Sequence, residues 1–307
     1  MYNILLSKIY ATLGELFMES KIIKAMLKND TIRIIACDTT YLCKEICKIH
    51  NLNEYTTLAF GRLMTAATMI STSNKFESDS IVIKFQGEGP INNMSAIAKG
   101  DGTLKGYICN PKASVNTSNF ADLLGKGFLT IIKDIGMKNP YTGKVPLYKG
   151  DITNDLAYYY TVSEQIPTAI SIGMDLDDNL EVKGSVGMMV QMLPGAEEMF
   201  TDIISYRIED LGNIGEHLKQ GKNIYDIINF MFDDMGVKIL EEKSIKYKCD
   251  CSKDKVERAL ISIGKEELEK IIKDNKSEEI ICDYCKKQYF FTNNNLVNLY
   301  NLIFKKG

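Results

Sequence analysis

The sequence lacks the side chains on which many enzymes depend. Its 307 residues include no tryptophan and only two histidines, His50 and His217. With so few histidines, a nucleophile activated by a histidine base is implausible. The one nearby pair is Cys47 and His50, but two side chains three residues apart on one predicted helix are poorly placed for such a proton transfer. We therefore expect a protein that is not an enzyme.

Glycine-rich phosphate loops are also missing. Gly87-x-Gly89 begins like a dinucleotide-binding fingerprint, but Pro90 and Asn92 follow where that motif requires a helix start and a third glycine. The Gly-Lys-Gly sequence at 125–127 lacks the spacing of a P-loop and the Ser or Thr that follows its lysine. Neither segment predicts a nucleotide site.

Long hydrophobic runs are absent as well, since none approaches the roughly 18–20 residues that a bilayer-spanning helix requires. The segment MYNILLSKIYATLGELF is interrupted by Lys8 and contains no small-residue cleavage site, so we expect no secretory signal. Met18 is an alternative start, which would make residues 1–17 an extension of little structural weight.

We expect a cytoplasmic protein that does not bind membranes. In that compartment the eight cysteines are thiols or metal ligands rather than structural disulfides.

Charge of either sign is moderate. The net charge of −3 argues against a general nucleic-acid binder. Residues 243–307 hold 14 Lys and Arg against 10 Asp and Glu, a net of +4, which leaves −7 for residues 1–242. This difference hints at two parts, and the length suits one large domain followed by a small one.

Alternating and helical hydrophobic patterns predict a mixed α+β domain over residues 18–195. The pattern changes near Pro194-Gly195, where this domain is expected to end. The predicted elements are strands at 31–38, 81–87 and 104–111, helices at 41–50, 55–70 and 150–165, and a hairpin formed by 168–174 and 180–193.

Residues 196–242 are predicted to form a helical linker. Two apolar stripes at helical spacing indicate helices that bury one face against another surface, which we expect to be the hairpin at 180–193. The apolar face consists of Phe200, Ile203, Ile204, Ile208, Leu211, Ile224, Ile227, Ile228, Met231 and Phe232.

The strongest motif lies in the last segment, residues 243–307. Cys249-x-Cys251 is followed after thirty residues by Cys282-x-x-Cys285. Two close pairs of thiolates supply four soft ligands in a tetrahedron, which is the closed geometry of a structural zinc site. Because all four positions are taken, such a zinc ion has no open site for catalysis. The intervening residues 256–275 are predicted to be helical, and 278–291 to form a hairpin with the second cysteine pair at its turn.

The other cysteines are expected to be structural. Cys43, Cys47 and His50 share one face of a predicted helix, but no further ligand is near in sequence, and small apolar cysteines often fill helix cores. Cys37 and Cys109 lie in predicted strands and are expected in the core.

With this cysteine pattern the chain resembles the redox-regulated heat-shock chaperones known as the 33 kDa chaperonins, or heat-shock protein 33. The resemblance covers nearly everything from about residue 20 onward. It is carried by ACDTT at 36–40, GRLMTAATM at 61–69, IKFQGEGP at 83–90, GYICNP at 106–111, the long segment 125–173, QMLPGAEE at 191–198 and CDCSKDKVERALISIGKEEL at 249–268.

The resemblance implies a holdase that is idle when reduced and bound to one zinc ion per chain. Oxidants with unfolding stress would pair Cys249 with Cys251 and Cys282 with Cys285, release zinc and unfold the linker. The oxidised protein would form a homodimer, hold unfolded clients and pass them to a heat-shock 70-type system.

Two other classes remain open from the residues alone. A zinc-ribbon nucleic-acid-binding protein would present a basic face with exposed aromatic side chains, yet the segment is only +4 and its aromatics at 289–291 cluster as if for a small core. A thiol oxidoreductase would need a low-pKa Cys-x-x-Cys at a helix N-terminus, whereas Cys282 and Cys285 are predicted in a hairpin turn.

Overall fold

We examined a computed structural model, which describes residues 19–304 except 29, 118 and 275–276. The chain forms two compact units that meet at Tyr247 and Lys248. We call residues 19–247 the body and residues 248–304 the C-terminal unit. The extension predicted at 1–17 lies outside the described residues.

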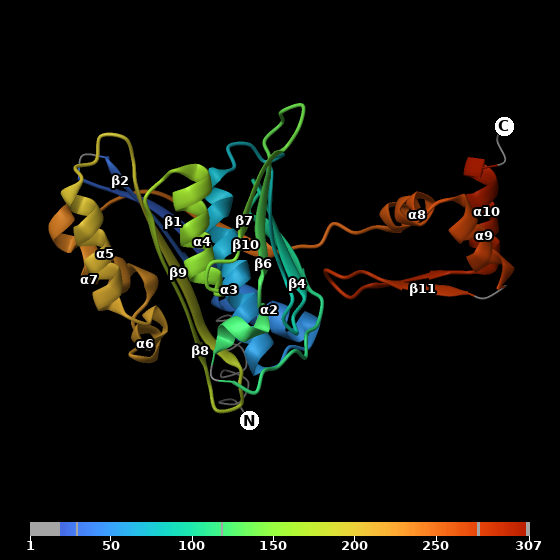
Figure 1. Ribbon diagram of the computed structural model, residues 1–307, viewed down its shortest axis with the longest axis horizontal. Helices are drawn as coiled ribbons and strands as arrows, with labels where there is room; N and C mark the ends of the chain where they lie inside the picture. The colour runs from blue at the N-terminus through green and yellow to red at the C-terminus, as the bar shows by residue number, and fades with distance from the viewer. Residues whose placement is uncertain (1–18, 29, 118, 275–276, 305–307) are drawn as a thin grey trace, which may run out of the picture. The chain divides into compact units, whose positions relative to one another are not determined.

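The body contains a ten-stranded sheet in the order β7-β6-β3-β4-β5-β10-β1-β2-β9-β8 (Figure 1). Neighbouring strands are antiparallel except β5 and β10, which pair in parallel through only two residue pairs. This short junction divides the sheet into two halves. One half consists of β1 (Ser20–Leu27), β2 (Ile32–Asp38), β8 (Thr168–Leu176), β9 (Val182–Met192) and β10 (Lys238–Tyr247), and the other of β3 (Ser80–Gly87), β4 (Asn93–Lys99), β5 (Thr103–Ile108), β6 (Gly127–Asp134) and β7 (Tyr141–Pro146).

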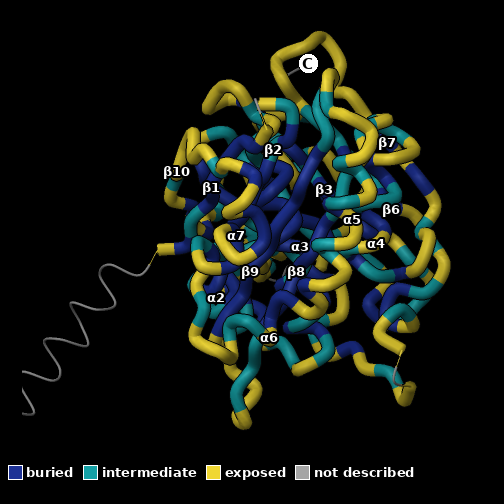
Figure 2. Tube along the Cα trace, turned by 90° about the vertical axis from the view of Figure 1, so that its left-hand side faces the viewer, coloured by how far each residue is buried: buried dark blue, intermediate teal, exposed yellow. Residues whose placement is uncertain are grey.

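Helix α3 (Glu54–Ile70) lies between the two halves and contacts strands of both. It begins at a capping box in which Asn53 and Thr56 exchange hydrogen bonds, so its first amide groups are satisfied. Together with α2 (Thr40–His50) and α4 (Ile152–Tyr159), it fills the larger hydrophobic core of the body. Figure 2 shows the buried residues concentrated along α3 and the adjoining strands.

The opposite face of the β1–β2–β9 region is covered by three helices, α5 (Met199–Leu211), α6 (Ile214–Lys219) and α7 (Ile224–Phe232). Strand alternation explains this second core: on β2, Ile35 and Cys37 face α3, whereas Ile34 and Ala36 face α5–α7. A strand buried on both faces must be apolar throughout, as this one is.

The helical prediction for residues 196–242 is wrong at its end. Strand β10 begins at Lys238 and pairs with β1, so the boundary predicted at 242/243 falls inside a strand. Cross-strand ion pairs support the pairing: Lys24 Nζ lies 2.8 Å from Glu241 Oε2, and Lys21 Nζ lies 3.2 Å from Glu242 Oε1.

The C-terminal unit has a small core of its own. The predicted hairpin is present as β11 (Glu278–Ile281) and β12 (Gln288–Phe291). The predicted helical insert forms two helices, α8 (Lys253–Ser262) and α9 (Lys265–Lys273), because Gly264 interrupts them with a φ of +99°. A further helix, α10 (Asn293–Phe304), was not predicted from the sequence.

The α+β class predicted from the sequence is confirmed, with a large mixed part followed by a small one that holds four cysteines. No helix in the described part of the chain is both long and apolar enough to cross a bilayer.

Candidate metal centre

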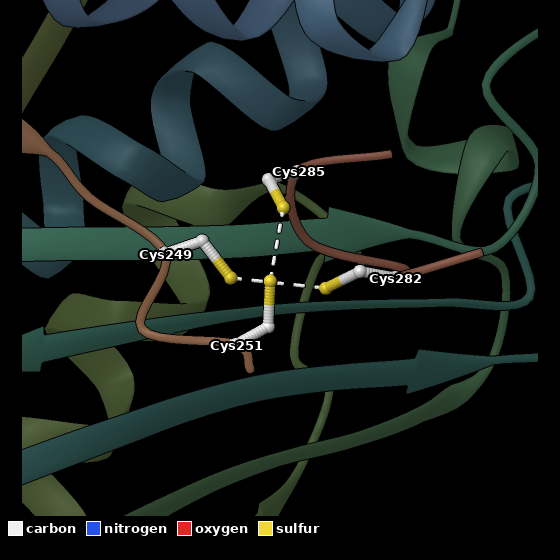
Figure 3. A group of neighbouring side chains, drawn as sticks. All are labelled: Cys249, Cys251, Cys282 and Cys285. Atoms are coloured by element: carbon white, nitrogen blue, oxygen red, sulfur yellow. Dashed lines mark hydrogen bonds between the residues drawn. The ribbon is translucent and has the colours of Figure 1, made fainter. Parts of the chain in front are cut away.

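Four cysteine side chains from two segments converge in the C-terminal unit (Figure 3). Cys249 and Cys251 precede α8. The side chain of Ser252 caps the start of this helix by accepting a hydrogen bond from Lys255 N. Cys282 and Cys285 lie in the turn between β11 and β12. The hairpin therefore presents one pair of sulfur atoms to the other pair.

Backbone hydrogen bonds fix the turn that carries the second pair. The amide of Cys282 donates to the Lys287 carbonyl at 2.9 Å, and the amide of Lys286 donates to the Cys282 carbonyl at 2.8 Å. Lys286 has a φ of +59°, a left-handed conformation that closes the turn. The sulfur atoms are thus positioned by the main chain rather than by their own packing.

The distances between the sulfur atoms fit a tetrahedral metal ion. Cys249 Sγ lies 3.7 Å from Cys282 Sγ, and Cys251 Sγ lies 3.4 Å from Cys285 Sγ. All four sulfur atoms lie within 4.8 Å of one another. A zinc–sulfur bond of about 2.3 Å requires sulfur atoms about 3.8 Å apart in a regular tetrahedron. The donor set therefore suits zinc or another metal ion that prefers thiolates.

Tyr289 on β12 is a site residue that the sequence analysis did not assign. Its phenol Oη donates to Cys251 Sγ at 3.0 Å. Burial raises the pKa of the Cys251 thiol, but hydrogen bonds from Tyr289 and the other three cysteines outweigh it and lower that pKa to about 7. The hydrogen bond to Cys251 raises the pKa of Tyr289, so this tyrosine stays a donor. In the sequence, Tyr289 is marked only by its position two residues before Phe291, which places both side chains on the same face of the strand, toward the small core.

The remaining cysteines lie in the body and form no such group. Cys37 and Cys43 are fully buried, and burial raises the pKa of the Cys43 thiol to about 11. Cys47 is half-buried, and His50 packs edge-on against Phe60 rather than beside another metal-binding side chain. Among the described residues, the only such metal-binding group is that of the four C-terminal cysteines.

The expectation that Cys109 lies in the core is wrong. Its side chain is exposed, because β5 ends at Ile108 and the chain leaves the sheet there.

The predicted apolar face of the linker lies largely against the body. All five α7 residues of this face are buried, as are Ile204 and Leu211 of α5. Phe200 and Ile208 are half-buried against the same core, and Ile203 lies outside it. The docking surface is broader than the predicted hairpin, because β1 and β2 contribute to it as well as β9.

Polar contacts also fix these helices. Arg207 on α5 forms a bidentate ion pair with Asp234, with distances of 2.7 and 2.6 Å, and also donates to the carbonyl of Met231 at the end of α7. Tyr225 on α7 donates its phenol hydrogen to Glu242 of β10. Helix α7 is therefore tied both to α5 and to the strand that leads toward Cys249.

The fold and the thiol cluster together define a class: an α+β body, followed by a small unit whose cysteines are arranged for a metal ion. The family model described as Hsp33 protein matches residues 20–292. The chain belongs to the Hsp33 family of chaperones.

Individual relatives agree with this assignment over most of the chain. The 33 kDa chaperonin of Clostridium novyi is 43% identical over 288 residues, covering 92% of this chain and 98% of the relative. The 33 kDa chaperonin of Clostridium beijerinckii is 43% identical over 290 residues, with 92% and 99% covered. The crystal structure of the Thermotoga maritima 33 kDa chaperonin superposes with a TM-score of 0.84 at 30% identity, covering 93% of this chain and 99% of that one.

Proposed function

We propose that this chain is a redox-regulated holdase, which binds unfolding proteins when oxidised and is idle when reduced and loaded with zinc. The observation that supports it most directly is the cluster of four thiols in a unit whose core, over the residues that the structure describes, contains five buried apolar side chains. So small a core is marginal by itself, so the state of the thiols decides whether the unit is folded.

In the reduced state Cys249, Cys251, Cys282 and Cys285 would hold the metal ion. Bound zinc supplies a charge that stabilises four thiolates close together and cross-links the two segments that carry them. Tyr289 orients Cys251 by its hydrogen bond, and the backbone of the hairpin holds Cys282 and Cys285 in reach of the first pair.

Oxidation by a peroxide would convert these thiolates into two disulfides. In each pair one sulfur attacks a peroxide oxygen and becomes a sulfenic acid, and the second sulfur then displaces water from it. Per disulfide, two thiolates lose two electrons, while one hydrogen peroxide takes up these electrons and two protons to give two water molecules. We assign the pairs as Cys249 with Cys251 and Cys282 with Cys285, in keeping with their spacing in the sequence.

The closest sulfur contacts join one cysteine from each pair, so the pairing itself needs a test. Peptide mapping of the oxidised protein by mass spectrometry separates the alternatives. Disulfides within each pair leave the segments around Cys249 and Cys282 unlinked, whereas cross-pairing joins them and overturns the assignment.

Loss of the folded C-terminal unit would loosen the body through β10. This strand is held to β5 by only two residue pairs, Lys246 with Thr103 and Tyr247 with Leu104, immediately before Cys249. Further along the same strand, Glu242 holds Tyr225 of α7. Fraying of β10 therefore weakens a contact of α7, and release of α5–α7 uncovers the apolar face of β1, β2 and β9. That face is the surface we assign to unfolded clients.

The wider activity follows from the same scheme. Two copies of the oxidised protein would form a homodimer through exposed apolar surface. The protein would act in the cytoplasm during heat and oxidative stress, and its clients would pass to a heat-shock 70-type system. We assign neither nucleic acid nor a membrane as a partner.

The test measures zinc content and suppression of aggregation in the same samples. Reduced protein is expected to carry one zinc per chain and to leave a thermally unfolding client to aggregate. After treatment with peroxide it should lose zinc and suppress aggregation, and a thiol reductant with added zinc should reverse both. Equal suppression by the reduced and oxidised forms would exclude redox regulation, and no suppression by either would exclude the holdase.

A further inference from the structure

A polar cavity of about 350 Å³ opens in the body, at the end where α3 leaves the space between the two halves of the sheet. Its walls come from β1 and β10 in one half, from the β4–β5 turn in the other, and from the turn after α3 at Ser71–Ser73. The volume lies near the lower end of the range for small-molecule sites, which is about 300–1,000 Å³.

The lining of this cavity has a charge opposite to that of the body around it. Lys24, Lys75, Lys99 and Lys243 line it, with Glu241 as the one carboxylate. Glu241 is already paired with Lys24 at 2.8 Å. The lining is therefore +3, although residues 1–242 carry a net charge of −7. Four ammonium groups around one cavity repel one another, and a bound polyanion would offset that repulsion.

Hydrogen bonds to the main chain order part of the lining. Asn74 donates its amide hydrogen to the Ala98 carbonyl at 3.3 Å. Lys243 Nζ is held in place by its hydrogen bond to the Gly100 carbonyl, so one cation is already positioned.

We propose that this cavity binds a small phosphorylated molecule with at least two phosphate charges. The lysines that line it contact the phosphate oxygens. Because the walls belong to both halves of the sheet, the bound ligand ties β1 and β10 to the β4–β5 turn. It thereby reinforces the body where β5 and β10 share only two residue pairs.

The cavity is lined by residues of the body alone and by no cysteine, so its failure leaves the chaperone proposal untouched. Full-length, reduced, zinc-loaded protein is titrated with pyrophosphate and with ADP by calorimetry, and the unfolding midpoint of the body is followed in parallel. Sodium chloride of equal ionic strength is the reference for screening. We expect a saturable heat and a rise of the midpoint with each phosphate probe, since a ligand that binds the folded state stabilises it.

Matched variants separate this site from general attraction of anions. The double variant Lys75→Gln/Lys99→Gln removes two lining charges, and Lys84→Gln/Lys126→Gln removes two charges outside the lining. We expect the first to weaken binding of pyrophosphate at least tenfold and the second to bind as the unaltered protein does. Removal of zinc by the probes would appear equally in both variants, because neither change touches the cysteines.

Three results would overturn the proposal: no saturable binding beyond chloride, undiminished binding by Lys75→Gln/Lys99→Gln, or equal weakening in both variants. Tighter binding of ADP than of pyrophosphate would support it and show that the nucleoside part also contacts the cavity. Equal affinities would also support it, with the phosphates alone recognised.

Discussion

The body and the C-terminal unit differ most in what holds them folded. Among the described residues, the two cores of the body contain 40 and 18 buried apolar side chains, whereas the core of the C-terminal unit contains five. Burial stabilises by roughly 25 cal/mol per Å² of apolar surface, so the body has ample driving force and the small unit has little. We therefore expect the body to fold without help from a metal ion, and the C-terminal unit to depend on the ion that we propose its cysteines hold.

One thiol of the C-terminal unit differs from the buried thiols of the body. In the body, burial raises the pKa of the thiols of Cys37, Cys43 and Cys47, which keeps them protonated and unreactive. In the C-terminal unit, burial also raises the pKa of Cys249 and Cys285, but hydrogen bonds lower the pKa of Cys251 to about 7. Cys251 is therefore the member of the cluster that ionises most readily near neutral pH.

The sharpest way to separate the two regions is to remove one metal ligand. Cys285→Ser is expected to abolish zinc binding and unfold residues 248–304, because structural zinc contributes on the order of 10–16 kcal/mol to so small a unit. The body should keep a cooperative unfolding transition for its elements other than β10 and α5–α7, which the proposed switch releases. Elemental analysis and hydrogen exchange measure both effects, with Cys109→Ser as the control, since that exposed thiol lies in the body. Stoichiometric zinc in Cys285→Ser would contradict the assignment of the ligands.

The second largest effect is expected where the linker helices meet the body. Ile227→Asp with Ile228→Asp places two carboxylates at fully buried positions of α7, which costs several kcal/mol. We expect this variant, reduced and zinc-loaded, to suppress aggregation of a thermally unfolding client, while the unaltered protein does not. Hydrogen exchange over 199–235 should then be fast in the variant and slow in the unaltered reduced protein.

The control for that variant adds the same charge to the same helix. Asn229→Asp with Phe230→Asp alters two exposed positions of α7, so it should stay docked and inactive. An Ile227/Ile228 variant that remains inactive with α5–α7 unprotected would show that release of the linker is not the activating step.

Local patterns predicted most of the elements, because each carries its own signal. The hairpin around Cys282 and Cys285 follows from alternation and turn spacing, and α7 from its i, i+3, i+4 stripe. Strand β10 was missed because Ile239 and Leu240 continue the helical apolar pattern, and only pairing with β1 fixes the segment as a strand. Such long-range pairing is not encoded in a local window.

The cysteine cluster was predictable from the sequence, but its tyrosine was not. The four cysteines could be grouped from their two close pairs, since that spacing is typical of thiolate metal sites. Tyr289 was not, because its phenol contacts a cysteine 38 residues away, and its place in the sequence is that of an ordinary core aromatic. Cys109 was misplaced because its strand was predicted to reach residue 111 but ends at Ile108, just before this cysteine.

A smaller effect is expected from the residue that supports the metal ligands. Tyr289→Phe keeps the ring but removes the hydrogen bond to Cys251, and loss of such a supporting contact commonly lowers metal affinity 10- to 100-fold. Competition with a zinc chelator measures it. Tyr300→Phe is the matched control in the same unit, since Tyr300 donates to Glu269 and not to a cysteine. Equal zinc affinities in the two variants would remove Tyr289 from the site.

The smallest effect on switching is expected when the thiols of the body are removed together. Cys37→Ala, Cys43→Ala and Cys47→Ala with Cys109→Ser eliminate every cysteine outside the C-terminal unit. The changes at buried Cys37 and Cys43 and at half-buried Cys47 should cost on the order of 1 kcal/mol each through lost packing, and the change at exposed Cys109 almost nothing. The response to peroxide should be unchanged, because a thiol that burial keeps protonated is a poor nucleophile toward peroxide.

The assay compares zinc release and aggregation suppression before and after peroxide at a temperature where the variant is folded. A folded variant that releases zinc but no longer suppresses aggregation would place a required thiol in the body, and the division between a structural region and a sensing region would then fail.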